Sequence, residues 1–119
     1  DAAVTLVHVV PALDVIPMTA FGMGAGARPH EVCEGDRQPL VEAKAVAEHH
    51  GVRATAELLI GDAVDEIVAC ADNLDADLIV IGSRGHGTLT SVLLGSVSSA
   101  VVHHADRPTL VIPHPIAGT

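Results

Sequence analysis

Aromatic side chains are almost absent from this sequence. One Phe and no Tyr or Trp occur among 119 residues, although 49% of the residues are hydrophobic. The apolar interior must therefore be built from Val, Ile, Leu and Ala, which suits helices packed on a parallel sheet. A chain of this length, residues 1–119, fits one compact domain.

Positive charge is also scarce, because six Lys and Arg face fifteen Asp and Glu, a formal net charge of −9. Nucleic-acid backbones require a basic surface, and single strands are bound by stacking on aromatic rings, so we expect no nucleic-acid partner. The deficit is uneven. Residues 31–77 carry twelve acids and three bases, whereas residues 82–119 carry two arginines and one aspartate. Only the second region does not repel an anion.

Cysteines and long apolar runs are equally limited. Cys33 and Cys70 are far apart and form no CxxC pair, which predicts reduced thiols in a cytoplasmic protein rather than a disulfide framework or a zinc site. No run approaches the ~20 apolar residues of a membrane span, and no signal-peptide pattern is visible. The adjacent histidines at 49–50 and 103–104 are expected at exposed helix ends and not at a metal.

Strand and helix patterns alternate along the chain. Apolar runs and alternating runs predict strands at 4–10, 52–60, 78–81 and 108–112, and helical periodicity predicts helices at 39–50, from Asp62 to about residue 72, and at 96–104. Residues 11–36 are expected to form a long loop and residues 114–119 a tail. This order predicts an α/β fold, a three-layer sandwich with a parallel sheet of four to five strands.

The predicted strands differ in their apolar patterns. The strand at 52–60 has one polar face, and prolines bracket the strand at 108–112, which places both at sheet edges. The strand at 78–81 is apolar at every position, which predicts burial on both faces in the middle of the sheet.

The stretch GSRGHGTLTSVLLGS, residues 82–96, follows directly on the apolar run DLIVI. Glycines at the carboxyl end of a strand let successive N–H groups turn inward around an anion. A helix that begins at Gly95-Ser96 adds unpaired N–H groups and a partial positive charge. The sequence therefore predicts a polyphosphate site, although the glycines alternatively serve only turns and a close helix–strand contact. It is not a Walker A loop, because that motif has Lys-Ser/Thr directly after its last glycine, whereas Ser96 and Val97 follow Gly95 here.

The spacing Gly82-x2-Gly85-x9-Gly95-Ser96 resembles the G-2x-G-9x-G-[S/T] signature of the universal stress protein family, and the similarity runs from residue 4 to about residue 113. The resemblance implies a Rossmann-like fold, similar to adenine nucleotide α-hydrolases. It further implies a cytoplasmic stress regulator that binds ATP, with Mg²⁺ in some members. A homodimer through the last strand, residues 108–112, is also typical of the family.

The resemblance implies roles for individual residues. Five residues of the signature and its surroundings would contact ribose and phosphates, namely Gly82, Gly85, Gly95, Ser96 and Val97. Adenine would lie against Ile81 and Val9. Independently of the resemblance, the loop itself would add the amide of Ser83, and Arg84 and His86 are the nearest substitutes for a phosphate-binding lysine.

One departure from the family concerns its opening strand, which ends in an Asp that helps to hold adenine. No such unit precedes the strand at 4–10. Either the chain is a fragment, or the flanking strands close up, or something else fills the position. An alternative function is therefore a dimerisation or interaction module of the same fold, with unknown protein partners, that binds no nucleotide. Without paired carboxylates, a catalytic triad or a catalytic lysine, the chain is expected to be at most a slow ATPase.

Overall fold

A computed structural model describes residues 2–17, 24–83 and 95–113, and the chain divides into two compact units, Asp1–Glu66 and Ile67–Thr119. The predicted alternation of strands and helices is confirmed, and the fold is α/β. In chain order the elements are β1 (Val4–Val10), β2 (Leu13–Pro17), β3 (Ala25–Pro29), α1 (Glu34–His49), β4 (Ala54–Ile60), α2 (Ala63–Asn73), β5 (Ile79–Gly82), α3 (Ser96–His104) and β6 (Thr109–Ile112).

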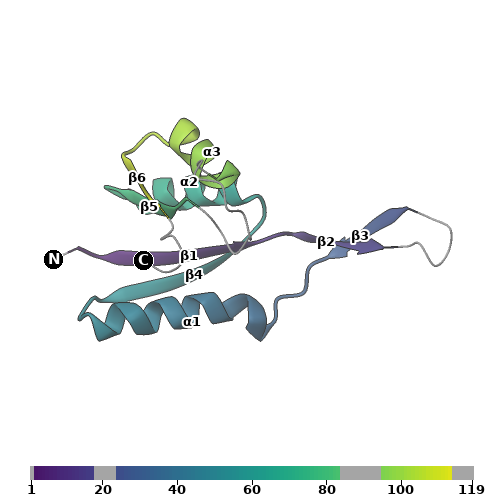
Figure 1. The fold of residues 1–119 in the computed structure, drawn as a ribbon, viewed down its shortest axis with the longest axis horizontal. Helices are drawn as coiled ribbons and strands as arrows, with labels where there is room; N and C mark the ends of the chain where they lie inside the picture. Colours follow the sequence, from purple (N-terminus) through teal and green to yellow (C-terminus); the bar gives the residue numbers. More distant parts are fainter. Residues whose placement is uncertain (1, 18–23, 84–94, 114–119) are drawn as a thin grey trace. The chain divides into compact units, whose positions relative to one another are not determined.

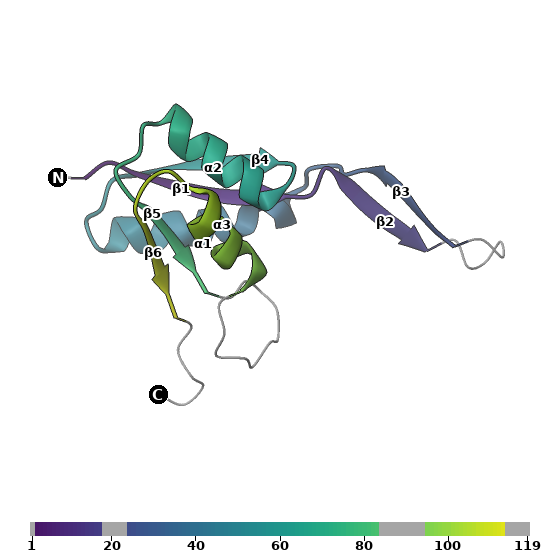
Figure 2. The ribbon, with the colours of Figure 1, turned by 90° about the horizontal axis from the view of Figure 1, so that it is seen from above.

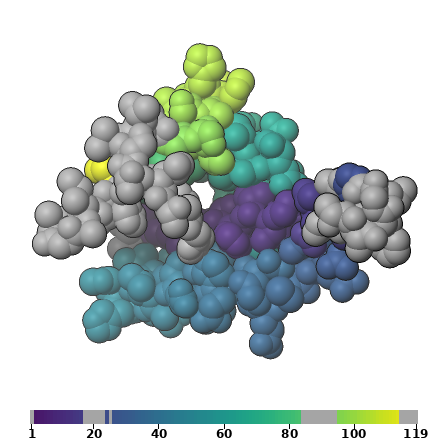
Figure 3. Space-filling view, turned by 45° about the vertical axis from the view of Figure 1, so that its right-hand side comes forward, coloured from purple at the N-terminus to yellow at the C-terminus, as the bar shows by residue number. Residues whose placement is uncertain are grey.

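The first unit is built on the parallel pair β1 and β4, which runs in register from Val4 opposite Ala54 to Val10 opposite Ile60. Helix α1 packs against both strands, and it lies along them in Figure 1. In Figure 3 the blue atoms of α1 form a layer against the purple atoms of β1. Val10 and Leu40 are the buried hydrophobic residues at this contact layer. The expected strand–helix–strand unit is therefore present.

Helix α1 begins five residues before the predicted start at Pro39. Cys33 is the N-cap residue, and its backbone N–H donates to the Asp36 carboxylate at 3.0 Å. This bond from the N-cap amide to the carboxylate three residues later helps to start the helix, although Cys33 is not one of the residue types that usually cap helices. Gly51 follows the predicted helix end at residue 50 and has φ +73°, the left-handed conformation common after the last turn of a helix.

The long loop predicted for residues 11–36 is wrong in part, because the segment contains an antiparallel hairpin. β2 pairs with β3 from Leu13 opposite Pro29 to Pro17 opposite Ala25. Figure 1 shows this hairpin extending beyond the end of β1 and α1 within the first unit. Its sequence carries no Asn-Gly or Asp-Gly turn between two alternating runs, so the usual hairpin signal was lacking.

The second unit contains the parallel pair β5 and β6, in register from Ile79 opposite Thr109 to Gly82 opposite Ile112. Figure 2 shows the two strands side by side with α3 near them, and α3 contacts β6. Val101 of α3 is fully enclosed and Ile79 of β5 is 8% exposed. The predicted helix 96–104 and the predicted last strand are confirmed, the strand beginning one residue later.

Parallel pairing, as predicted for the sheet, is present in each of the two units of the described residues. Their strands make three two-stranded sheets, β1–β4, β2–β3 and β5–β6. β5 has one pairing partner among these strands, and Leu78 and Val80 are 48% and 59% exposed. The prediction that this strand is buried on both faces is therefore wrong, because Ile79 is buried whereas Leu78 and Val80 are exposed.

Helix α2 starts where the sequence predicted. The Asp62 carboxylate accepts the backbone N–H of Asp65 at 3.1 Å, which is an N-cap bond. Ala71 of this helix is 7% exposed. No helix within the described ranges is long and apolar enough to cross a membrane.

Candidate phosphate site at the start of helix α3

The two ends of the glycine-rich loop lie next to each other in the second unit. The backbone N–H of Gly95 donates to the carbonyl of Ser83 at 2.7 Å. A Cβ atom at Gly95 would lie 2.5 Å from that same carbonyl oxygen, closer than a carbon and an oxygen can approach. Gly95 is thus required by the close contact between the end of β5 and the start of α3.

The amide of Ser83 is not free to bind an anion. Its N–H donates to the carbonyl of Ile112 at 2.9 Å, which extends the ladder between β5 and β6. Because the Gly95 amide is bonded to Ser83, two of the N–H groups at the loop ends already have partners. The prediction that the Ser83 amide would receive an anion is therefore wrong. Arg84, Gly85 and His86 lie outside the described residues.

The first turn of α3 supplies the remaining candidate donors. Gly95 is the N-cap residue, and the carbonyl of Gly95 accepts the Ser99 N–H at 2.9 Å and the Ser98 hydroxyl at 3.1 Å. The amides of Ser96 and Val97 precede the first intrahelical donor, so the helix itself offers them no acceptor. Both residues are exposed, and this turn can accept an external anion.

The first turns of the three helices differ in the number of acidic residues that they contain. Acidic residues stand in the first turns of α1 and α2, whereas α3 has none there. A carboxylate in the first turn occupies the positive end of the helix dipole. The start of α3 therefore keeps its partial positive charge without a carboxylate of its own.

The two residues that the resemblance places beside adenine belong to different units. Val9 is half-buried in β1 of the first unit, next to the last residue of that strand, and Ile81 is half-buried in β5 of the second. Gly82 is the last residue of β5. The contact between Gly95 and Ser83 therefore defines only the phosphate half of the predicted site.

Arg107 makes a contact that the sequence did not predict. One guanidinium nitrogen donates to the Ala76 carbonyl at 2.6 Å, and the other to the Asp72 carboxylate at 3.0 Å. The side chain is 18% exposed and ties the end of α2 to the segment before β6. A lone arginine after an aspartate carries no sequence signal for such a pairing, because its partners are more than thirty residues away.

A second missed group lies in the first unit, where the His30 ring is hydrogen-bonded to the carboxylates of Asp14 and Asp36. Its signal was hidden by the incorrect assignment of a loop to this segment. Among the described residues, no three His, Cys, Asp or Glu side chains are arranged to hold a metal ion. The histidines at 49–50 and 103–104 are exposed and stand at the ends of α1 and α3, as expected.

The architecture defines a Rossmann-like α/β protein with parallel strands and a helix start facing the carboxyl end of a strand. A model of the universal stress protein family matches residues 1–113. The chain belongs to the universal stress protein family.

Individual relatives agree with this assignment. The chain is 40% identical over 82 residues to universal stress protein MJ0531 of Methanocaldococcus jannaschii, covering 69% of this chain and 48% of the relative. It is 42% identical over 64 residues to universal stress protein Sll1388 of Synechocystis, covering 54% of this chain and 42% of the relative. The chain thus spans about half or less of these curated relatives.

Solved structures show the same fold. A universal stress protein from Archaeoglobus fulgidus superposes with a TM-score of 0.66 at 25% identity, covering 92% of this chain and 75% of that structure. Protein MJ0577, a universal stress protein of Methanocaldococcus jannaschii, superposes with a TM-score of 0.63 at 25% identity, covering 97% of this chain and 78% of that one.

Proposed function

We propose that this chain is a cytoplasmic stress-response regulator that binds the phosphates of an adenine nucleotide, ATP, at the first turn of α3. Family membership and the spacing Gly82-x2-Gly85-x9-Gly95-Ser96 support the proposal. The observation that carries it is the 2.7 Å bond from the Gly95 amide to the Ser83 carbonyl. This bond holds the start of α3 at the carboxyl end of β5, where α/β folds bind their ligands.

The phosphates would be bound by the amides of Ser96 and Val97 and by the Ser96 hydroxyl. These groups combine free N–H donors with the positive end of a helix that has no acidic residue in its first turn. Gly85 would complete the site from the loop, as the resemblance implies, and Arg84 and His86 would be the nearest substitutes for a phosphate-binding lysine. Mg²⁺, where present, would be held through the phosphate oxygens, because the first turn of α3 offers no carboxylate.

The mode of action that follows is binding rather than turnover. Phosphoryl transfer is accelerated mainly by positively charged groups that neutralise the developing charge. The described part of the site offers amides and hydroxyls, and Arg107, the nearest cation along α3 and β6, is already bonded to Asp72 and Ala76. At most a slow ATPase activity is proposed.

The test compares two added charges on the same helix. Ser96→Glu places a carboxylate at the proposed phosphate position, whereas Ser99→Glu places it three residues later, about 4.5 Å along the axis, on a residue whose amide already bonds Gly95. Both serines are exposed. Because hydrogen bonds to charged groups contribute ~1.5–3 kcal/mol, Ser96→Glu should weaken ATP binding by roughly 10- to 100-fold in calorimetry.

Competition measurements on the unaltered protein distinguish binding through the phosphates from binding through adenine. Inorganic tripolyphosphate should displace ATP, whereas adenosine should not. Equal affinities of Ser96→Glu and Ser99→Glu, or an unaltered protein that does not bind ATP, would contradict the proposal.

A second candidate function is an interaction module of the same fold that dimerises through β6 without nucleotide. It is favoured by the amides of Ser83 and Gly95, which are already paired, and by the close contact that accounts for Gly95 without any ligand. Leu110 and Ile112 on β6 are 49% and 46% exposed. A second copy is a natural partner for such an apolar edge strand.

Two matched substitutions test this candidate. Burying a leucine stabilises an interface by ~1.5–3 kcal/mol, so Leu110→Lys should weaken self-association by roughly tenfold or more in sedimentation equilibrium. Val102 on α3 is 46% exposed, and Val102→Lys should leave self-association unchanged. A native chain that is monomeric at all concentrations, or equal effects of the two lysines, would refute dimerisation through β6.

A further inference from the structure

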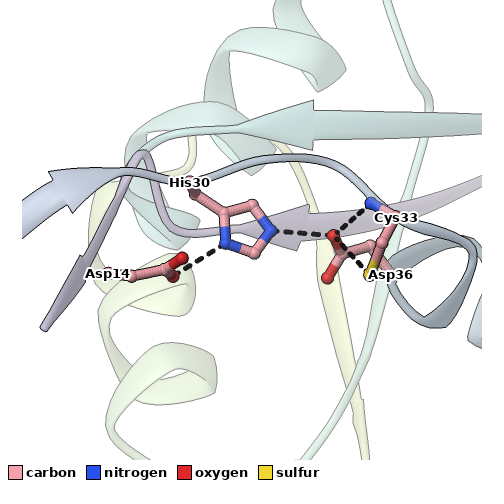
Figure 4. A network of polar contacts seen from close by, with 4 residues as sticks. All are labelled: Asp14, His30, Cys33 and Asp36. Carbon is pink, nitrogen blue, oxygen red and sulfur yellow. Dashed lines mark hydrogen bonds and ion pairs between the residues drawn. The ribbon is translucent and has the colours of Figure 1, made fainter. Parts of the chain in front are cut away.

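His30 lies between two carboxylates in the first unit. Its Nδ1 is 2.7 Å from Oδ1 of Asp14 and its Nε2 is 2.7 Å from Oδ2 of Asp36. Figure 4 shows the imidazole ring bridging the two side chains. The three side chains are 14%, 34% and 16% exposed for His30, Asp14 and Asp36, so the bridge is partly shielded from water.

The geometry requires a proton on each ring nitrogen. An ionised carboxylate can only accept hydrogen bonds, and a neutral imidazole has a single N–H donor. Two contacts of 2.7 Å therefore describe an imidazolium between two carboxylates. The hydrogen bond to Asp14, followed by the one to Asp36, raises the pKa of His30 above its ordinary value of 6.5.

The bridge joins three separate segments of the fold. Asp14 stands in β2, His30 follows β3, and Asp36 lies in the first turn of α1. Asp36 also accepts the Cys33 amide at 3.0 Å, so the carboxylate that starts α1 is the one that contacts the imidazole. The link thus runs from the hairpin to the beginning of the helix.

The hairpin has few other means of stabilisation. A two-stranded hairpin alone is marginally stable in water, and Leu13 and Val15 of β2 are 58% and 76% exposed. The backbone bond from His30 to Ala12, at 2.8 Å, closes its open end. The side-chain bridge adds the connection between this closed end and α1.

We propose that His30 is a pH-responsive clasp that fastens the β2–β3 hairpin to the start of α1 when protonated and releases it when neutral. Loss of one proton leaves a ring nitrogen whose lone pair faces a carboxylate oxygen, so one of the two contacts must open. Opening toward Asp36 separates the hairpin from α1, and opening toward Asp14 loosens β2. The clasp acts independently of nucleotide binding.

The direction of the pH effect follows from the raised pKa of His30. Stabilisation by the clasp is complete below the unfolded value of about 6.5 and is lost as the pH rises through the folded value. The Cys33 amide first, and then the bond to His30, lower the pKa of Asp36 below 3.8. The contact between His30 and Asp36 therefore weakens at the acid end as the pH falls through that lowered value.

Other charged groups surround the clasp. Arg28 stands opposite Asp14 in the strand register, and the Cys33 thiol lies 3.6 Å from Asp36. Along the connecting segment and the first turn of α1, the remaining charged residues are Glu31, Glu34 and Arg37. Glu31 supplies the matched control, because Glu31→Gln removes one nearby negative charge and leaves both contacts of His30 in place.

The first measurement is an NMR titration of the histidine ring nitrogens in the unaltered chain, with the His30 signals assigned by their loss in His30→Gln. Both nitrogens of His30 should be protonated at weakly acidic pH, and its midpoint should lie above 6.5. Asp14→Asn and Asp36→Asn should each lower the midpoint, and Glu31→Gln should change it less than either. A midpoint at or below 6.5 in the unaltered chain would overturn the proposal.

The second measurement is amide hydrogen exchange in residues 13–17 and 25–29, corrected for the intrinsic pH dependence of exchange. Protection should fall as the pH passes the His30 midpoint. Each pKa unit by which that midpoint exceeds 6.5 should give a tenfold loss of protection. His30→Gln should show low protection with no midpoint, whereas His49→Gln should behave as the unaltered chain. Hairpin protection that is equal on both sides of the midpoint would refute the clasp.

Discussion

Replacing Gly95 by alanine tests whether the contact between α3 and β5 holds the second unit together. Gly95 has φ −64° and ψ 159°, a conformation that every L-residue adopts. The backbone therefore imposes no strain on alanine, and the smaller entropy of the unfolded chain would favour alanine by ~0.4–1 kcal/mol. Any destabilisation must come from the new Cβ atom.

The expected magnitude follows from the geometry. The Cβ would lie 2.5 Å from the Ser83 carbonyl oxygen, so the helix start must withdraw by roughly 1 Å to reach an ordinary contact distance. That movement lengthens the 2.7 Å bond from the Gly95 amide, which costs ~0.5–1.5 kcal/mol. With the strain of overpacking, ~1–3 kcal/mol, and after the entropic offset of ~0.4–1 kcal/mol, the net loss in the free energy of unfolding should be about 0.5–4 kcal/mol.

Two other glycines provide controls. A Cβ at Gly24 would meet nothing within 4 Å, so Gly24→Ala should be neutral or stabilising by up to ~1 kcal/mol. A Cβ at Gly51 would also meet nothing, but φ is +73°, so Gly51→Ala should cost about 1 kcal/mol through backbone strain alone. Together these two controls distinguish the steric overlap expected in Gly95→Ala from the backbone strain expected in Gly51→Ala.

Urea unfolding followed by far-ultraviolet circular dichroism is the suitable assay, because the chain has no Trp or Tyr to report by fluorescence. The midpoint should fall for Gly95→Ala with little change in the slope. If Gly95→Ala proves as stable as Gly24→Ala, the close contact does not exist in solution, and the structural basis of the proposed phosphate site fails with it.

Two further substitutions test contacts that lie outside that site. Asp62→Ala removes the acceptor of the Asp65 amide and should cost ~1 kcal/mol of stability in urea, whereas Asp62→Asn should recover most of it; equal losses in both would exclude capping. Arg107→Lys replaces a two-pronged guanidinium that donates to Ala76 by a single ammonium and should cost ~1–3 kcal/mol. The exposed Arg53→Lys should have no effect, and an Arg107→Lys midpoint that matches it would refute the contribution of this contact.

Most elements could be predicted from the sequence because their signals are local. The apolar run at 4–10 and the helical periodicity after Asp62 need only neighbouring residues to be recognised, and both elements are present. The signature from Gly82 to Ser96 likewise indicated the family, which the match over residues 1–113 confirms.

The incorrect assignments have a common physical cause. The hairpin of β2 and β3 depends on pairing between two strands without a characteristic turn, and the start of α1 depends on a cysteine–aspartate cap. The burial expected for residues 78–81 assumed neighbouring strands on both sides, whereas β5 pairs only with β6 among the described strands. Each depends on partners that local composition does not identify.

The residues by themselves determined an α/β fold, its family and the position of a helix start beside a glycine-rich turn, because periodicity and motif spacing are properties of the linear chain. Only the tertiary structure decided that the Ser83 amide bonds Ile112, that Gly95 must lack a side chain, and that His30 bridges Asp14 and Asp36. Those outcomes depend on where distant donors and acceptors meet, and hydrogen bonds form over about 3 Å of space regardless of separation along the chain.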